Sequence, residues 1–236
     1  MIQPRRKRVY DRVEVAQEAD GYGILLDGKP LRTPAKAPLR VPGRRLAEAI
    51  AAEWAAQGAE LDPAAMPLTR LAGSAIDLVG PNRPEIVSRT AAYAATDLLC
   101  YRAEAPPELV ERQDAAWQPI LDWLAQRYGA VLRVTQGIMA VEQPAEALTA
   151  LRSPVEAADN LRLTALAALA AACGSLAIAL GVAEGRLDAE AAWALSQLDE
   201  TYQIEQWGED AEAASRRAAL RAEIAAAAQF LALLAA

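Results

Sequence analysis

The stretch from residue 163 to residue 183 contains no charged side chain, and it constrains the fold more than any other feature of the chain. A helix of this length could in principle cross a membrane. Alanine is the commonest residue of the stretch, however, and gains little from lipid, and Gly174 with Ser175 interrupts it. We therefore expect a helix hairpin or a bent helix buried at the centre of a helical domain, with no membrane insertion.

Alternating apolar and polar residues near the start of the chain predict antiparallel β-strands. The alternation covers Val9–Ala16, and a second run, Gly21–Leu26, leads into an Asp-Gly pair at residues 27 and 28 that is typical of a tight hairpin turn. Lys29–Thr33 and Leu39–Val41 are the extended pieces that follow. The pattern predicts a small antiparallel sheet.

After residue 43 the spacing of apolar residues becomes helical. Leu46, Ile50 and Trp54 fall on one face, which predicts a helix docked on the sheet through Trp54. Residues 97–102 form a short extended piece, whereas 131–134 and 138–141 are either strands or linkers. The further helices that we expect are residues 68–79, 85–95, 107–128, 145–151, 155–173, 175–183, 188–207 and 210–236.

These elements predict an α+β fold in two parts. A chain of 236 residues could hold one large core or two smaller ones. We prefer two, because Pro63 and Pro67 mark a connector where the pattern changes. Residues 1–66 then form a small antiparallel β-rich domain with one docked helix, and residues 67–236 form a larger, mostly helical domain.

The charge balance argues against nucleic acid as a partner. The formal net charge is −7, whereas phosphate binding needs a basic surface. A basic run at residues 5–8 is the exception; it could touch an acidic partner, but we interpret it as a solvated end before the first strand. No apolar segment follows it, so we expect no export signal. Cys100 and Cys173 have no metal or redox spacing and should be buried thiols in a reducing compartment.

The chemistry of most enzymes is missing. The chain has no histidine, which removes the commonest general base and the commonest metal ligand. It also has no phosphate-binding loop, and the glycines at residues 21 and 23 form a turn, not a dinucleotide site. The acid pairs at residues 199–200 and 209–210 could serve glycoside chemistry but are more typical of solvated helix ends. We expect no catalysis, no metal and no cofactor.

The segment at residues 188–207 is the strongest candidate for a binding surface. In a single helix, Trp193, Glu200, Ile204 and Trp207 would share one face, opposite a second apolar face. A carboxylate among apolar neighbours is costly unless it is solvated or paired. Glu200 is therefore either solvated or bonded within the domain, for example to Arg162, or it awaits a basic group on a partner protein.

Three motifs resemble one known family, and the likeness runs from about residue 8 to about residue 231. They are Met66-Pro-Leu-Thr-Arg-Leu-Ala-Gly-Ser-Ala-Ile-Asp77, Thr96-Asp-Leu-Leu-Cys-Tyr-Arg102 and Tyr202-Gln-Ile-Glu-Gln-Trp-Gly208. The family is the ATP synthase assembly factors that chaperone the alpha subunit of the catalytic head, in mitochondria and alphaproteobacteria. The resemblance implies a non-enzymatic protein that holds the free alpha subunit and shields its beta-facing surface from aggregation.

The resemblance also implies a partner-binding site on the third motif. An acid just before the Tyr-Gln pair matters in the family; Glu200 matches best here, with Asp199 leaving the register open by one. Trp207 matches the motif directly, and we expect Trp207→Ala to damage both folding and binding. The expected site is Asp199, Glu200, Tyr202, Gln203, Trp207 and Gly208. No role is carried over to the two residues before Trp207.

The alanine-rich sequence and the short start before the first strand favour a bacterial cytoplasmic protein, or a mature mitochondrial matrix form. We expect a monomer when it is free, with the ATP synthase alpha subunit as its partner. The alternative is an adaptor or scaffold that uses the same faces for another protein. Binding of a small substrate would instead indicate an enzyme.

Overall fold

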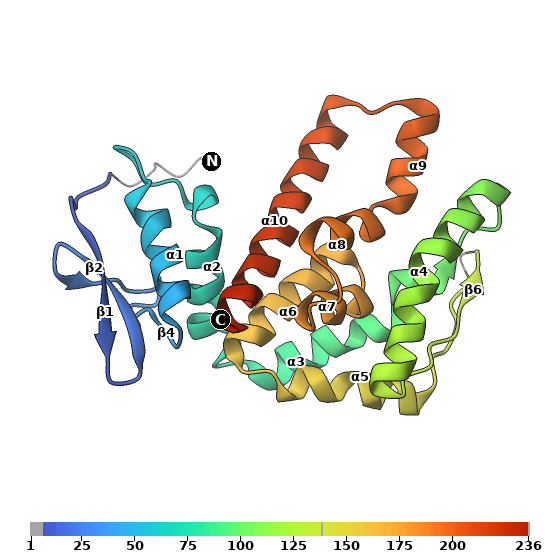
Figure 1. Cartoon of the computed structure of the whole chain (residues 1–236), viewed down its shortest axis with the longest axis horizontal. Coiled ribbons are helices and arrows are strands. Elements are labelled where there is room, and N and C mark those ends of the chain that lie inside the picture. The colour runs from blue at the N-terminus through green and yellow to red at the C-terminus, as the bar shows by residue number, and fades with distance from the viewer. Residues whose placement is uncertain (1–6, 138, 236) are drawn as a thin grey trace. The chain divides into compact units, whose positions relative to one another are not determined.

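The chain of the computed structural model is described for residues 7–137 and 139–235 (Figure 1). By its internal contacts it forms two compact units. Unit 1 runs to Arg83 and includes Asn160–Thr164 and the residues from Gln229 on. Unit 2 comprises Pro84–Asp159 and Ala165–Ala228. A functional boundary at residues 66 and 67 stays a prediction.

The hairpin of unit 1 forms at the expected turn, because the residues at positions 27 and 28 both have positive φ, 50° and 77°. The turn joins β2 (Gly21–Leu26) to β3 (Lys29–Pro30), and β1 (Val13–Glu18) pairs antiparallel with the other side of β2. β4 (Arg40–Val41) also pairs with β2. The predicted antiparallel sheet is confirmed.

Two predicted strands have the wrong bounds, because side chains and turns take over the backbone hydrogen bonds. β1 begins four residues later than Val9, since the Asp27 carboxylate accepts the N–H groups of Asp11 and Arg12. The return strand ends at Pro30, and Thr33 instead closes a turn by donating its N–H to the carbonyl of Ala37.

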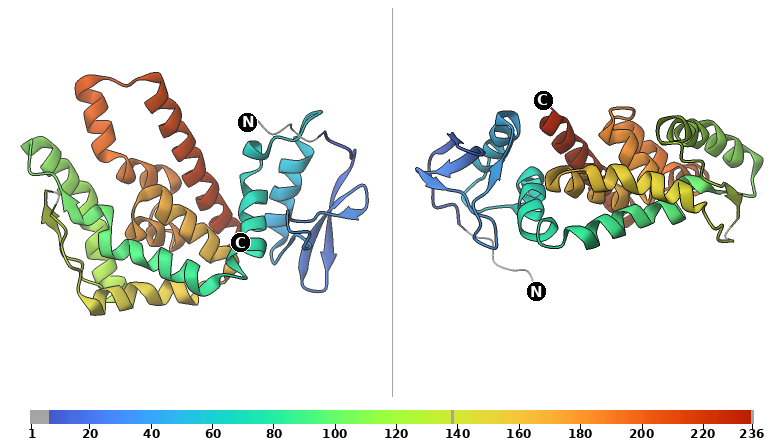
Figure 2. Two further views of the ribbon diagram at one scale, coloured as in Figure 1. Left: turned by 180° about the vertical axis from the view of Figure 1, so that it is seen from behind. Right: turned by 90° about the horizontal axis from the view of Figure 1, so that it is seen from below.

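The helix α1 (Arg44–Ala55) lies against the sheet, as both views of Figure 2 show. Leu46 and Ile50 are fully buried, and Ile24 of β2 is fully buried as well. That Trp54 itself docks α1 on the sheet stays a prediction, and its hydrogen bonds link it to other parts of the chain. Its Nε1 donates to Thr69 Oγ1 at 3.1 Å, and its carbonyl accepts the Tyr10 hydroxyl at 2.8 Å. Trp54 therefore joins α1 to the chain start and to the next helix.

The first family motif begins the next helices, and two carboxylates hold it in place. α2 (Pro67–Ser74) continues into the π-helical turn η2 (Ala75–Val79) after the short helix η1 (Pro63–Ala65). Glu53 accepts the free N–H groups of Leu68 and Thr69 at 2.7 and 2.8 Å, which caps α2. Asp77 of η2 accepts the hydroxyl of Thr33 at 2.7 Å.

Arg8, the last residue of the basic run, is not the solvated end that the sequence predicted. Its guanidinium donates to the carbonyls of Ala55 and Gln57, at the carboxyl end of α1. A cation there satisfies free carbonyls and suits the helix dipole. Arg5 and Arg6 lie outside the described residues, and Lys7 is exposed.

Unit 2 is built almost entirely of helices, as expected. Two of them, α6 and α10, also contribute residues to unit 1. Its elements are α3 (Arg83–Ala92), η3 (Tyr93–Thr96), η4 (Leu98–Cys100), β5 (Tyr101–Arg102), α4 (Pro107–Tyr128), β6 (Thr135–Gln136), α5 (Ala145–Ala157), α6 (Asn160–Cys173), α7 (Leu176–Ala183), α8 (Ala189–Ser196), α9 (Leu198–Trp207) and α10 (Ala211–Ala235).

The charge-free stretch folds as predicted, into two helices broken at Gly174, which has φ 62°. Neither α6 nor α7 has the length of a membrane span. Every residue of α7 from Leu176 to Val182 is buried. In the described part of the chain, α10 alone has the length and hydropathy of a span, a property that core helices of soluble proteins share.

In unit 2, the structure differs from the sequence prediction at α5 and decides between the alternatives for the segment before it. The expected break between residues 151 and 155 is wrong: α5 continues through Pro154 to Ala157, because Ala147, Leu151 and Val155 bury one continuous face. Residues 131–134 are linker, since the side chain of Gln143 hydrogen-bonds both backbone groups of Arg133 where a strand partner would. Ile138 lies outside the described residues.

The Asp97 side chain connects η4 to the start of α7 in the core of unit 2. Its fully buried carboxylate accepts the N–H of Leu99 at 3.1 Å, which caps η4. It also accepts the Ser175 hydroxyl at 2.7 Å and the N–H of Ala177 at 2.9 Å, at the start of α7. One side chain thus satisfies free donors of two helices that lie far apart in sequence.

We expect the Asp97 carboxyl to titrate near neutrality. Burial raises its pKa to about 6, and the donors from Ala177, Ser175 and Leu99 oppose this only in part. Because the folded pKa lies above the unfolded value of 3.8, folded Asp97 binds its proton first as pH falls. Its contribution to the free energy of unfolding should therefore grow by up to about 3 kcal/mol as pH falls from about 6 to about 4.

Carboxyl ¹³C NMR between pH 2 and 8 measures this directly. Asp27 is an internal reference in the same spectra, since backbone hydrogen bonds from Arg12 and Asp11 lower its pKa. If Asp97 titrates below 4 instead, its hydrogen bonds outweigh its burial, and acid would remove stability rather than add it.

Candidate functional site

The predicted single helix at residues 188–207 is wrong, and the break decides where the candidate site residues lie. α8 is capped by Asp188, which accepts the N–H of Ala191, and it ends at Ser196. Gln197 then leaves the helical region, with φ −114° and ψ 20°. The Ser196 hydroxyl donates to the carbonyl of Trp193, a local bond that competes with helix continuation. A new helix, α9, begins at Leu198.

The break places the two candidate acids at the start of a helix, where negative charge is favourable. Asp199 and Glu200 occupy the first turn of α9, where backbone N–H groups are free and the helix dipole favours negative charge. Glu200 is exposed and Asp199 is half-buried. The sequence argument placed Glu200 among apolar neighbours of one long helix, and that premise no longer holds.

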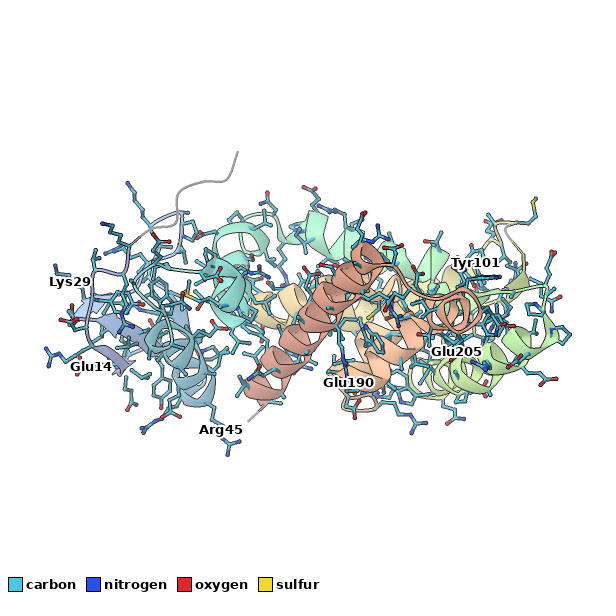
Figure 3. The ribbon with its side chains drawn as sticks, turned by 90° about the horizontal axis from the view of Figure 1, so that it is seen from above. Glu14, Lys29, Arg45, Tyr101, Glu190 and Glu205 are labelled. Atoms are coloured by element: carbon cyan, nitrogen blue, oxygen red, sulfur yellow. The ribbon has the colours of Figure 1, made fainter. Side chains whose placement is uncertain are left out.

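One side of α9 faces α4. Gln113 of α4 donates from Nε2 to Asp199 Oδ1 at 2.7 Å. Tyr202 is 7% exposed, and the Arg112 guanidinium carbon lies 5.3 Å from the centre of its ring. Arg112 also pairs with Glu205 at 2.6 Å, and Figure 3 shows Glu205 on this side of α9. These contacts hold α9 against α4.

The opposite side of α9 is open, and we call Glu200, Gln203 and Trp207 its outer face. The three residues are exposed and follow one another at three- and four-residue intervals, so they form one stripe. Trp207 is 78% exposed, although large apolar side chains are normally covered. The outer face therefore combines a negative charge, an amide and a wide aromatic surface.

The end of α9 is fixed as well. Gly208 closes the helix with its N–H bonded to the carbonyl of Ile204 at 2.8 Å, and its φ of 84° suits glycine. Arg217 of α10 then pairs with Glu209 at 3.1 Å and donates to the Thr201 hydroxyl at 2.9 Å. Asp210 caps α10, because its carboxylate accepts the N–H of Ala213.

A groove of about 490 Å³ lies between α8 and α10, next to α9. The guanidinium carbons of Arg217 and Arg221 lie 5.0 and 5.1 Å from the centre of the Trp193 ring. Arg221 pairs with Glu190, which Figure 3 shows beside α10. The alanine side chains that line the groove are Ala214, Ala218, Ala222 and Ala225. Small side chains therefore line much of the groove. Its charged residues form ion pairs with one another, Arg217 with Glu209 and Arg221 with Glu190.

A second exposed apolar surface lies on the linker between α4 and α5. Met139 is 76% exposed and Val131 66%, and Val134 is also open to solvent. The linker is held by parallel pairing of β6 with β5 and by the Gly137 N–H, which donates to the Arg102 carbonyl at 2.9 Å. Unit 2 thus presents apolar side chains at two places outside its core.

The described residues hold no group of acids or cysteines able to bind a metal ion. Burial raises the pKa of Cys100 and of Cys173 to about 12, so neither thiol is a nucleophile near neutral pH. Exposed apolar side chains, as on α9 and on the linker before α5, are typical of protein-binding surfaces.

The six predicted site residues therefore fall into three groups by position. Asp199 and Tyr202 face α4, Glu200, Gln203 and Trp207 face outward, and Gly208 shapes the turn to α10. Sequence reasoning missed Gln113, which is 1% exposed and touches Asp199 from 86 residues away. Its spacing, four residues before Trp117 on the apolar face of the predicted helix, was the available signal in the sequence.

Comparison with known proteins gives one consistent family. The model of the family described as ATP12 chaperone protein matches residues 7–125. The mitochondrial protein atp12 of Schizosaccharomyces pombe is 27% identical over an alignment of 218 positions, which covers 87% of this chain and 75% of that protein. The crystal structure of Atp12 from Paracoccus denitrificans is 44% identical, covers 97% of this chain and 98% of its own, and has a TM-score of 0.93.

A variant of the Paracoccus protein with one aspartate replaced by lysine is 43% identical to this chain, covers 97% of it and 98% of its own, and also has a TM-score of 0.93. That substitution therefore leaves the relative's fold as similar to this chain as before. The structural likeness extends well beyond residue 125, where the family model stops.

We expect two aromatic substitutions on α9 to differ in stability. Tyr202→Ala removes a buried ring packed under Arg112 and should lower the free energy of unfolding by about 3 kcal/mol. Trp207→Ala should change it by less than about 0.5 kcal/mol, because the side chain is mostly in solvent. The exposure removes the folding defect that the sequence predicted for Trp207→Ala. Urea denaturation measures both, and a large loss for Trp207→Ala would mean that the outer face is covered in solution.

Proposed function

Because the chain belongs to the ATP12 chaperone family and is thus an assembly chaperone for ATP synthase, we propose that its client is the free alpha subunit of the catalytic head. It holds this subunit without ATP, covers the surface that later faces the beta subunit, and so prevents aggregation. It has no catalytic activity. It works in the bacterial cytoplasm, or in the mitochondrial matrix if the source is eukaryotic.

The outer face of α9 is the observation that carries this proposal. An exposed tryptophan is a typical anchor of protein interfaces, and a neighbouring charge sets register and orientation. Here Trp207 supplies the anchor and Glu200 the charge. The client would present an apolar depression for the ring and a basic side chain for the carboxylate.

The fixed position of α9 suits a chaperone that must release its client. A preformed face binds without the entropic cost of ordering a helix, so a small contact area can give useful affinity. The beta subunit then displaces the chaperone if it binds the same surface of the alpha subunit more tightly. Differential affinity drives the exchange, and no nucleotide is needed.

Charge reversal at Glu200 tests the proposal. We expect Glu200→Lys to weaken alpha-subunit binding at least tenfold, because a lysine would oppose the basic group of the client. The melting temperature should fall by only a few degrees, since the residue is exposed and only its favourable interaction with the helix dipole is lost. Size-exclusion chromatography of mixtures with the alpha subunit, and separately with the beta subunit, measures binding at physiological salt.

Glu212→Lys is the matched control. Glu212 is an exposed acid in the first turn of α10, so the same reversal costs a similar dipole interaction away from the outer face, together with an exposed ion pair to Arg216 at 3.2 Å. This control should bind the alpha subunit normally. Equal loss in both variants would trace the effect to net charge, and no complex with wild-type chain would leave the adaptor as the better account.

A further inference from the structure

Gln113 is nearly fully buried, and its amide makes two hydrogen bonds with opposite requirements. Its Oε1 accepts the N–H of Ala103 at 2.7 Å, and its Nε2 donates to Asp199 Oδ1, also at 2.7 Å. A flipped amide would set its NH₂ against the N–H of Ala103 and its oxygen against the carboxylate. The orientation is therefore fixed, and position 199 must supply an acceptor.

The Gln113 backbone is fixed too. Its carbonyl accepts Arg102 NH1 at 2.6 Å, and Arg102 is only 3% exposed. The Arg102 guanidinium lies over the Trp117 ring, 5.2 Å from its centre, and 3.7 Å from the Asp114 carboxylate. Trp117 in turn donates its Nε1 to the carbonyl of Leu195, at the end of α8. Gln113 thus belongs to a buried network that reaches α9 at a single side chain, Asp199.

The two adjacent acids of α9 therefore do different things. Successive side chains on a helix point about 100° apart, so Asp199 can face α4 while Glu200 faces solvent. We propose that Gln113 and Asp199 are positioning residues, which fix the rotation of α9 about its axis and so aim the outer face at the client. Glu200 is the acid that meets the client. This proposal rests on the function proposed above and assigns its key acid.

The chemistry of the two acids separates them experimentally. Positioning needs only a hydrogen-bond acceptor at residue 199, which asparagine supplies through its amide oxygen. An ion pair with a basic client group needs the charge itself. Asp199→Asn should therefore preserve binding within about threefold, whereas Asp199→Ala and Gln113→Leu should weaken it about tenfold. Glu200→Gln should weaken it about tenfold as well.

Amide hydrogen exchange of the peptide covering residues 198–207 measures how firmly α9 is held in the protein without any client. Asp199→Ala and Gln113→Leu should raise its exchange rate about tenfold, because α9 loses its tie to the buried network. Asp199→Asn and Glu200→Gln should leave the exchange rate unchanged. Affinity for purified alpha subunit is then measured on the same four proteins by calorimetric titration.

The outcomes distinguish failure of the positioning role from failure of the proposed binding to the alpha subunit. Wild-type exchange and wild-type binding in both Gln113→Leu and Asp199→Ala would overturn the positioning role. Loss of binding in Asp199→Asn with wild-type exchange would overturn it as well, since the Asp199 charge would then contact the client. If Gln113→Leu fails to fold, the contrast between Asp199→Asn and Asp199→Ala decides. If wild-type chain does not bind the alpha subunit, the proposed function fails, whereas exchange still tests the tie between α4 and α9.

Discussion

The buried carboxylate of Asp97 is the interaction on which the helical unit depends. It satisfies donors at η4 and at the start of α7, where the Leu98 N–H also donates to the Gly174 carbonyl at 3.0 Å. A buried charge without such donors would cost several kcal/mol, and the donors would be left unpaired without the carboxyl oxygens. The second family motif is therefore a structural motif, since four of its residues, Asp97, Leu99, Cys100 and Arg102, are buried.

The same motif connects the core to the candidate site. Arg102 follows five residues after Asp97, and its buried guanidinium carries the network through Gln113 to Asp199. Polar networks of this kind specify one arrangement, because each member must find its partners. The outer face of α9 is thereby presented on a rigid support. A rigid, exposed Trp207 is what a chaperone of folded but unassembled subunits would need.

Unit 2 exposes apolar groups in two places, on α9 and on the linker that carries Val131 and Met139. Exposed apolar surface is a liability in a free protein and marks interaction sites when it recurs. Each place is held by defined contacts, through Asp199 on α9 and through Gln143 on the linker. The groove beside Trp193 differs from both, because its charges are paired within the protein.

The sequence alone determined the α+β class, the hairpin at residues 27 and 28, most helices and the absence of histidine chemistry, because these follow from local period and composition. Through the resemblance, the sequence also predicts a partner-binding site on the third motif. It could not locate the break at Gln197, where a serine side chain and tertiary contacts outweigh a continuous helical pattern. Only the tertiary structure distinguished Asp199 from Glu200, because adjacent acids are equivalent in sequence until Gln113, far away in the chain, binds one of them and leaves the other in solvent.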